Sequence, residues 1–347
     1  MAFALRIPRL AAGRRAPALT AMPVTIRDVA EAAGVSIGTV SRALKNQRGL
    51  SDETRRRVRS TARKLGYDSD RLRGNKVQRL VFLVHRQHST FATNPFFSLV
   101  LQGVEAACRD YGTVPTLLAT GPADPVRDQL RLHEPDALLP AGFFEPEVLS
   151  LLASLELPMA LVDYWVPGMR SVNPDNVQGG YIATRHLLDI GRRRIAYLAG
   201  SLAHFSIRER EQGYRRALFE AGMLADPDLE VIAPPGLGHD QGAEVAIRQL
   251  LRLRQRPDAV FAYNDSAALA VLRVCQEAGL RVPQDIAIVG FDDIPAAGFA
   301  TTPLSTLRVD QELLGRTGVE LIMRGEEMPQ EITLPVELVV RQSTREA

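Results

Sequence analysis

The spacing of apolar residues changes near residue 79 of this chain. Before that point they recur every three or four positions, as in Ile26, Val29, Ala30 and Ala33, which predicts short amphipathic helices. After it, short apolar runs such as 80–84 alternate with helical stretches. Such runs are typical of buried parallel strands, and their alternation with helices predicts doubly wound α/β sheets. The strands are too many for one sheet, so we expect two lobes.

The periodicity predicts these elements after residue 79. Helices are expected over 95–111, 126–132, 148–155, 179–190, 207–221, 241–253, 266–278 and 312–324, and strands over 80–84, 114–119, 136–140, 159–162, 194–199, 229–233, 259–263, 286–291 and 331–341.

Residues 25–44 predict two short helices joined by a tight turn. Thr25 is a good N-cap with Asp28 three residues later, and Gly34 can take the left-handed conformation that ends a helix. Ser36 then caps a second helix. Its small outward residues would let the backbone approach a DNA major groove, where Arg42 can offer two donors to a guanine edge. Spacing alone leaves an αα-hairpin of an ordinary core open.

Three motifs resemble the N-terminal headpiece of the lactose-repressor (LacI-type) family of transcription regulators. They are Asp28-Val-Ala, Ala33-Gly-Val-Ser and Thr39-Val-Ser-Arg. The resemblance implies a helix-turn-helix that binds double-stranded operator DNA, with a third helix opened by Ser51. We expect Ser36, Thr39 and Ser41 to fix the DNA backbone and Ile37, Gly38 and Arg42 to read bases. Thr25 and Asn46 complete the expected DNA contacts.

The resemblance weakens over residues 68–76, Asp-Ser-Asp-Arg-Leu-Arg-Gly-Asn-Lys. Family members usually carry a hinge helix here, with a leucine that wedges into the minor groove. Leu72 is the candidate wedge, but its register differs from the family pattern and the segment is shorter. A flexible linker is the open alternative.

The rest of the chain resembles the effector domain of the same family, which is similar to periplasmic sugar-binding proteins. The motifs include Asn94-Pro-Phe-Phe97, Asp175-Asn176, Arg210-Glu-Gln-Gly-Tyr214, Tyr263-Asn-Asp265 and Val289-Gly-Phe-Asp-Asp293. The resemblance implies a periplasmic-binding-protein-like fold of two Rossmann-like lobes, with the chain crossing between them near 172–175, 303–309 and 325–330. No heptad pattern follows Arg341, so we expect a homodimer rather than a tetramer.

The expected domain boundaries follow from these motifs. A disordered extension is expected over 1–22, which could lie upstream of a native start at Met22, followed by the all-α headpiece over 23–67 and a short hinge or linker over 68–78. The effector-binding and dimerisation domain is expected over 79–341 and a tail over 342–347. Within that domain, lobe 1 is expected at about 79–172 and 307–327, and lobe 2 at about 173–306 and 328–341.

Doubly wound sheets bind ligands at the carboxyl ends of their strands, and eight candidate contacts follow such ends. They are Phe96, Phe97, Trp165, His204, Ser206, Arg210, Asn264 and Asp292, of which the resemblance favours Arg210 and Asp292 most. Aromatic faces beside donors and acceptors can hold a sugar ring or a nucleobase. A sugar is the expected effector, and a purine is the alternative.

The distribution of charge supports a DNA-binding front on an acidic body. Residues 1–22 carry four arginines and no acid, residues 23–78 carry 13 basic and 6 acidic residues, and the remainder carries 25 basic and 34 acidic. Phosphate neutralisation by basic residues supplies most non-specific DNA affinity. Cys108 and Cys275 are expected to be reduced thiols.

No catalytic, cofactor or phosphate-loop motif is evident, and the six histidines lack the spacing of metal ligands. Asp292-Asp293 could hold a metal, but an acidic pair facing the cleft is the simpler interpretation. We therefore expect no enzyme activity, no cofactor, no metal and no membrane partner, and a cytoplasmic location on the nucleoid. A transport-type solute-binding protein and a cleft enzyme stay open as remote alternatives.

Overall fold

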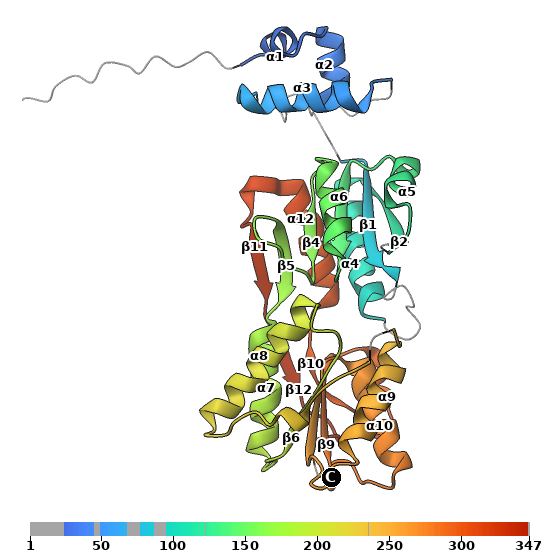
Figure 1. The fold of residues 1–347 in the computed structure, drawn as a ribbon, viewed down its shortest axis with the longest axis vertical. Helices are drawn as coiled ribbons and strands as arrows, with labels where there is room; N and C mark the ends of the chain where they lie inside the picture. The colour runs from blue at the N-terminus through green and yellow to red at the C-terminus, as the bar shows by residue number, and fades with distance from the viewer. Residues whose placement is uncertain are drawn as a thin grey trace, which may run out of the picture. The chain divides into compact units, whose positions relative to one another are not determined.

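The computed structural model describes residues 24–44, 49–67, 77–86, 95–121, 123–234 and 236–345. The chain divides into two compact units, a headpiece that precedes Val77 and a body that begins there (Figure 1). Several predictions fall outside the described residues: the extension over 1–22, the contact by Asn46, the motif residue Asn94, and the linker over 68–76 with its wedge Leu72. Those predictions stay untested.

The headpiece consists of three helices: α1 (Ile26–Ala33), α2 (Ile37–Leu44) and α3 (Asp52–Lys64). The predicted capping box opens α1, with the Asp28 carboxylate accepting from the Thr25 backbone N–H at 2.7 Å. Gly34 ends α1 at φ 63°, as expected. Val29, Val40 and Val58, one from each helix, are fully buried against one another. Val29, Ala30 and Ala33 of the predicted apolar face of α1 are buried and Ile26 is half-buried, whereas Leu65 after α3, predicted to face the first two helices, is 38% exposed.

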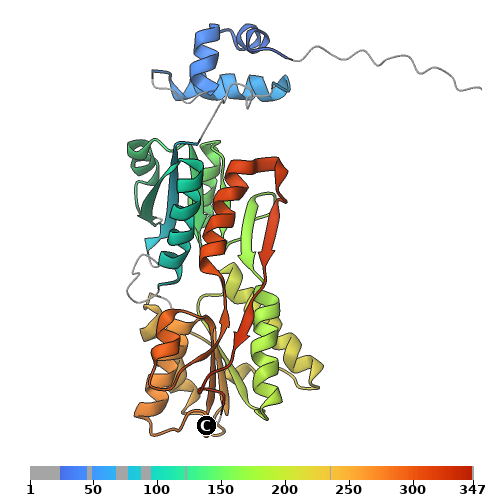
Figure 2. The same ribbon diagram turned by 180° about the vertical axis from the view of Figure 1, so that it is seen from behind.

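The body contains two six-stranded sheets, each covered by helices (Figures 1 and 2). The first lobe contains β1 (Arg79–His85), α4 (Phe96–Tyr111), β2 (Val114–Thr120), α5 (Val126–His133), β3 (Ala137–Ala141), α6 (Pro146–Ser154), β4 (Ala160–Val162), β5 (Arg170–Pro174), α12 (Gln311–Arg324) and β11 (Glu331–Leu334). The second contains α7 (Asn176–Asp189), β6 (Ile195–Ala199), α8 (Phe205–Glu220), β7 (Glu230–Ile232), α9 (His239–Leu250), β8 (Ala259–Ala262), α10 (Asp265–Glu277), β9 (Ala287–Asp292), α11 (Pro295–Phe299), β10 (Ser305–Arg308) and β12 (Glu337–Val339).

The strand order is β11-β5-β4-β3-β1-β2 in the first sheet and β12-β10-β9-β8-β6-β7 in the second. Every pairing is parallel except that of β12 with β10. The predicted single strand over 331–341 is wrong: β11 belongs to the first sheet and β12 to the second. The third crossing consequently lies at 335–336, not near 325–330. The apolar pattern continues through both strands, so the pattern alone does not show that β11 and β12 pair with different sheets.

Strands β5 and β10 and helix α11 were not predicted from the sequence. Arg170-Ser-Val-Asn-Pro174 and Ser305-Thr-Leu-Arg308 contain few apolar residues, so neither shows the run expected of a buried strand. Both strands are nevertheless mostly buried, because neighbouring parallel strands and helices cover them. Among the described helices, none is long and apolar enough to cross a membrane.

Glycines bring two helix pairs into close backbone contact. A Cβ on Gly103 of α4 would lie 1.9 Å from the Glu312 carbonyl oxygen of α12, and a Cβ on Gly180 of α7 would lie 2.1 Å from the Arg210 carbonyl oxygen of α8. Only a residue without a Cβ fits at such a distance. The α7–α8 contact fixes the backbone of Arg210, which lines the cavity between the two lobes.

Candidate functional site

The outer face of α2 in the headpiece carries the residues predicted to contact DNA. Ile37 is 44% exposed, and Gly38 and Arg42 are also exposed, whereas Thr39 and Ser41 are half-buried. The Arg42 Nε donates to the Gly38 carbonyl at 3.3 Å, which lays the guanidinium along this face. The predicted face exists, and small residues beside Arg42 keep its backbone accessible.

Some hydroxyls of the predicted DNA contacts also cap helices. Ser36 Oγ accepts the Thr39 backbone N–H at 3.2 Å, and the Thr25 hydroxyl donates to Asp28 at 2.8 Å. These hydrogen bonds from Thr25 lower the pKa of the Asp28 carboxyl. Thr25 therefore has a structural role that is independent of any DNA contact.

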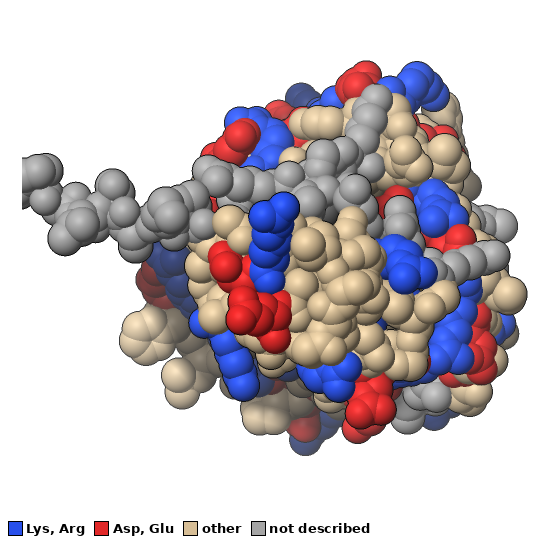
Figure 3. Space-filling view, turned by 90° about the horizontal axis from the view of Figure 1, so that it is seen from above, with Lys and Arg blue, Asp and Glu red and all other residues tan. Residues whose placement is uncertain are grey.

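Helix α3 of the headpiece also carries exposed basic side chains. Arg56, Arg57, Arg63 and Lys64 of α3 are exposed. In Figure 3, both basic and acidic side chains lie around an uncharged area. The exposed basic side chains of α3 suit contacts with DNA phosphates.

A cavity of about 530 Å³, including space open to solvent, lies between the two lobes of the body. Seven of the eight predicted effector contacts line it: Phe96, Phe97, His204, Ser206, Arg210, Asn264 and Asp292. The two phenylalanines begin α4 of the first lobe, and the others come from the second lobe. The expectation that ligands bind at the carboxyl ends of strands therefore selected residues that lie together in the fold, although they are up to about 200 positions apart in the sequence.

Arg210 is the best-anchored polar residue of the cavity. Its Nε donates to Asn176 Oδ1 at 2.9 Å and its Nη1 to the Tyr263 carbonyl at 2.5 Å. The guanidinium carbon lies 3.6 Å from the centroid of the Phe291 ring, and Nη2 lies 3.8 Å from Asp292 Oδ1. These partners hold the guanidinium rigidly, so it can present a fixed donor to a bound molecule.

Two carboxyl groups face the same cavity from opposite lobes, those of the buried Asp292 and the half-buried Asp163. Burial raises the pKa of Asp292 well above its usual value, against the opposing effect of Arg210. Burial likewise raises the pKa of Asp163, to about 6. Asp163 Oδ1 is buried without a hydrogen-bond partner in the part of the chain that the structure describes. An unpaired buried acceptor costs free energy, which a ligand donor would recover.

Both aspartates have strained backbones. Asp163 lies at φ 52° and Asp292 at φ 117°, in the region that favours glycine. Such strain costs on the order of 1–3 kcal/mol per residue and concentrates at ligand-binding sites. Both aspartates thus combine a strained backbone with a place in the cavity lining, and Asp163 also has an unpaired oxygen.

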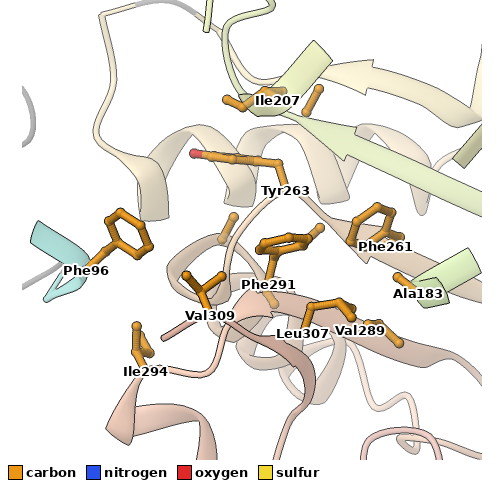
Figure 4. Close-up of a cluster of buried hydrophobic side chains, with 14 of the residues drawn as sticks. Phe96, Ala183, Ile207, Phe261, Tyr263, Val289, Phe291, Ile294, Leu307 and Val309 are labelled. Atoms are coloured by element: carbon orange, nitrogen blue, oxygen red, sulfur yellow. The ribbon is translucent and has the colours of Figure 1, made fainter. Parts of the chain in front are cut away.

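Histidine and tyrosine side chains complete the wall. Burial lowers the pKa of His204 to about 4, so its ring is neutral, and it packs 4.9 Å from the Phe143 ring. His239 Nδ1 lies 2.6 Å from the Tyr263 hydroxyl. In Figure 4, Phe96 points from the first lobe toward the apolar cluster of the second, which includes Tyr263 and Phe291. The polar groups thus lie beside a closed apolar surface.

Seven further residues line this cavity that were not predicted from the sequence as effector contacts: Gly142, Asp163, Gly200, Ser201, Ile207, His239 and Tyr263. Asp163 and Tyr263 directly follow β4 and β8, so the strand-end signal that selected Asn264 also applied to them. His239 begins α9 after a glycine-containing loop, and no sequence signal places it beside Tyr263.

Trp165 does not join the other seven predicted contacts. Its ring stacks on Phe205, with centroids 6.0 Å apart and an interplanar angle of 26°, and it lines a separate pocket. The left-handed conformation of Asp163 turns the chain after β4, which directs Trp165 away from the first cavity.

The described residues offer no metal centre. No group of three or more histidine, cysteine or acidic side chains in the described ranges could hold an ion. Asp293 instead accepts from Arg308 and Arg341, each at 2.7 Å, so the Asp292-Asp293 pair is not a free pair of ligands.

Comparisons with known proteins agree with both parts of this structure. Residues 25–70 match the family described as bacterial regulatory proteins, lacI family, and residues 184–344 match the periplasmic binding protein-like domain. The HTH-type transcriptional repressor PurR of Photobacterium profundum is 33% identical, over 93% of this chain and 99% of its own length. The ribose operon repressor of Haemophilus influenzae is 31% identical, over 88% of this chain and 93% of its own length.

Solved structures give the same result. The transcriptional regulator CelR in complex with cellobiose is 31% identical with a TM-score of 0.70, covering 92% of this chain and 99% of its own. The lac repressor dimer bound to operator and an anti-inducer is 26% identical with a TM-score of 0.68, and the match covers 93% of this chain and 99% of the lac repressor chain. These relatives are transcription regulators rather than enzymes. The chain therefore belongs to the LacI family of DNA-binding transcriptional repressors.

Proposed function

We propose that this repressor binds a palindromic operator as a homodimer and that a sugar in the interlobe cavity controls its affinity for DNA. The observation that carries the effector proposal is a pair of aspartates that face one cavity from different lobes: Asp292, which is buried, and Asp163, whose Oδ1 atom is buried. We expect the protein in the cytoplasm, where it can associate with the nucleoid.

The headpiece supports the operator part of the proposal. The exposed face of α2 is narrow at Gly38 and carries Arg42, which matches a helix that enters a major groove. Ser36, Thr39 and Ser41 would contact phosphates, and Ile37, Gly38 and Arg42 would contact base edges. The basic residues of α3 would add affinity that does not depend on sequence.

Exposed apolar side chains support a homodimer. Val114 is 64% exposed on β2, the edge strand of the first sheet, and Leu132 of the following helix α5 is 84% exposed. In the second lobe, Phe299 is 90% exposed. Large exposed apolar groups at a sheet edge are typical of surfaces that another chain covers. A two-fold partner would bring two headpieces to the two halves of a palindrome.

The chemistry of the cavity favours a sugar over a purine. Vicinal hydroxyls of a sugar can donate to Asp163 and Asp292 and accept from Arg210, while the Phe96 ring packs against carbon-bound hydrogens. A purine base has fewer N–H donors for two carboxyl groups. It remains the second candidate because several similar proteins are repressors named PurR.

The position of the cavity accounts for control of DNA binding. A ligand that contacts Asp163 in one lobe and Asp292 in the other favours the lobe arrangement in which both contacts form. Such differential binding to two states is the physical requirement for allostery. The change would reach the headpieces of the dimer and alter the affinity for the operator.

The test combines calorimetric titration with a DNA-binding assay on the purified protein. Hexoses, pentoses, cellobiose, hypoxanthine and guanine are titrated separately, and operator binding is followed by fluorescence anisotropy on a palindrome selected from random DNA. A sugar should bind and change operator affinity. If only a purine binds, the sugar assignment is wrong. If a ligand binds without changing operator affinity, the control mechanism is wrong.

A further inference from the structure

A second pocket of about 770 Å³, including space open to solvent, lies beside the strand crossings of the body. Its floor is one face of β5 and β11, whose residues Ser171 and Asn173 pair in register with Glu331 and Thr333. In parallel strands, paired residues two positions apart share one face. Figure 1 shows β5 and β11 together at one edge of their sheet, below the label of β11. Phe205 and Glu209 of α8 supply a wall from the second lobe.

Two buried polar atoms of this floor have no partner. Ser171 is fully buried and Asn173 is 7% exposed, yet Ser171 Oγ and Asn173 Oδ1 make no hydrogen bond within the described residues. The other side-chain atom of the Asn173 amide, Nδ2, donates to the Tyr164 carbonyl at 3.3 Å. Buried acceptors are normally satisfied, so a ligand that donates hydrogen bonds would complete this surface.

The charged side chains of the pocket indicate that the ligand carries a positive charge. Asp175, Glu209 and Glu331 line it, and no lysine, arginine or histidine does so among the described residues. Burial raises the pKa of Glu209; Arg208, its neighbour on α8, opposes this effect and Asp175 adds to it. Arg208 itself donates to the Leu202 carbonyl. A positively charged donor would relieve both the desolvation and the repulsion between these carboxylates.

The aromatic rim adds a second preference. Trp165 stacks on Phe205, and both rings line the pocket. Tryptophan is the ring that attracts an ammonium group best, and its face also packs against methylene groups. Three features therefore converge: unpaired acceptors, a lining with three carboxylates and no basic side chain among the described residues, and a stacked aromatic pair.

We propose that this pocket binds a small alkylammonium ion, such as a diamine. The ammonium group would donate to Ser171 and Asn173 beside Glu209, and the alkyl chain would lie against Trp165 and Phe205. The lining of this site differs from that of the interlobe cavity. Asn176 separates the two sites, since it lines this pocket while its Oδ1 holds Arg210.

Trp165 is the single tryptophan of the chain, so its fluorescence reports directly on this pocket. The full-length protein is titrated with putrescine, and with 1,4-butanediol as a neutral molecule of similar length. We expect a saturable fluorescence change with putrescine and none with the diol. Glu209→Gln should weaken putrescine binding at least about tenfold, as for loss of a hydrogen bond to a charged group. Glu220→Gln, on the same helix but outside the pocket, should leave binding within about twofold.

Calorimetric titration of the same variants tests binding independently of fluorescence. An equal response to putrescine and the diol would overturn the charge argument. No binding of putrescine by the wild-type protein, or unchanged binding by a folded Glu209→Gln variant, would overturn the site. Thermal unfolding of each variant establishes that it is folded. No sugar is present in these titrations, so their outcome is separate from that of the effector proposal.

Discussion

Replacing Asp292 by asparagine tests the effector proposal with little change in shape. The carboxyl group is buried at the end of β9, and its nearest cation is Arg210 at 3.8 Å. Asparagine keeps the size and one acceptor oxygen but removes the charge and the second acceptor. At a pH where this carboxyl group is ionised, against the burial that raises its pKa, the substitution therefore removes a charged acceptor from the cavity without opening a void.

The expected loss of effector affinity follows from the value of a hydrogen bond to a charged group. Such a bond contributes about 1.5–3 kcal/mol, and each 1.4 kcal/mol is about tenfold in affinity. We therefore expect the dissociation constant to rise between about tenfold and 150-fold. Breaking a tight buried ion pair costs about 3–5 kcal/mol of stability. Here the loss should be well below that, because Arg210 keeps its bonds to Asn176 and Tyr263 and its contact with Phe291.

The assay is calorimetric titration of the effector that the screen identifies, followed by operator binding with and without it. Asp292→Asn should bind operator like the wild type and respond only at much higher effector concentration. Asp189→Asn, which alters an exposed ion pair with Arg185, is the matched control and should behave as wild type. Unchanged effector affinity in a folded Asp292→Asn variant would refute the role of this carboxyl group.

Three further predictions address the headpiece, the buried carboxyl groups and the helix contact. Arg42→Ala should weaken operator binding by about 1–3 kcal/mol and relax one base position; anisotropy with operator and random DNA measures this, and an equal loss on both would contradict base reading. The contribution of Asp163 to the free energy of unfolding should fall as pH rises from about 4 to about 6, because its folded pKa lies above its unfolded value and the native state holds the proton more tightly; Asp163→Asn should therefore make the slope of unfolding free energy against pH less negative over this range in denaturant titrations, and an unchanged slope would contradict the raised pKa. Gly180→Ala should destabilise the body by more than the about 1–3 kcal/mol of ordinary overpacking, because its Cβ would meet the Arg210 backbone; a calorimetric unfolding midpoint equal to the wild type would contradict the close contact.

The headpiece was predictable from the sequence because its determinants are local. Thr25, Asp28 and Gly34 act within a single helix, and the apolar spacing of α1 to α3 directly specifies which faces are buried. Arg42 was placed on the exposed face of α2 for the same reason. Helical periodicity and capping operate over a few residues, so they can be read without knowledge of the rest of the fold.

The candidate effector site was predictable only in part. The rule that ligands bind at strand ends selected Arg210, Asn264 and Asp292 correctly as neighbours in one cavity. It also selected Trp165, which the turn at Asp163 directs into another pocket. A strand end specifies the edge of the sheet, but the backbone conformation of the next residues decides which cavity a side chain enters.

Several features were decided by the tertiary structure alone. The sequence by itself determined two α/β lobes, the headpiece and most of the polar residues of the cavity. It did not assign β11 and β12 to different sheets, detect the unpaired oxygen of Asp163, or place the Trp165 ring on Phe205. Each of these depends on contacts between segments distant along the chain, where hydrogen-bond pairing and burial are settled by packing rather than by the local pattern of residues.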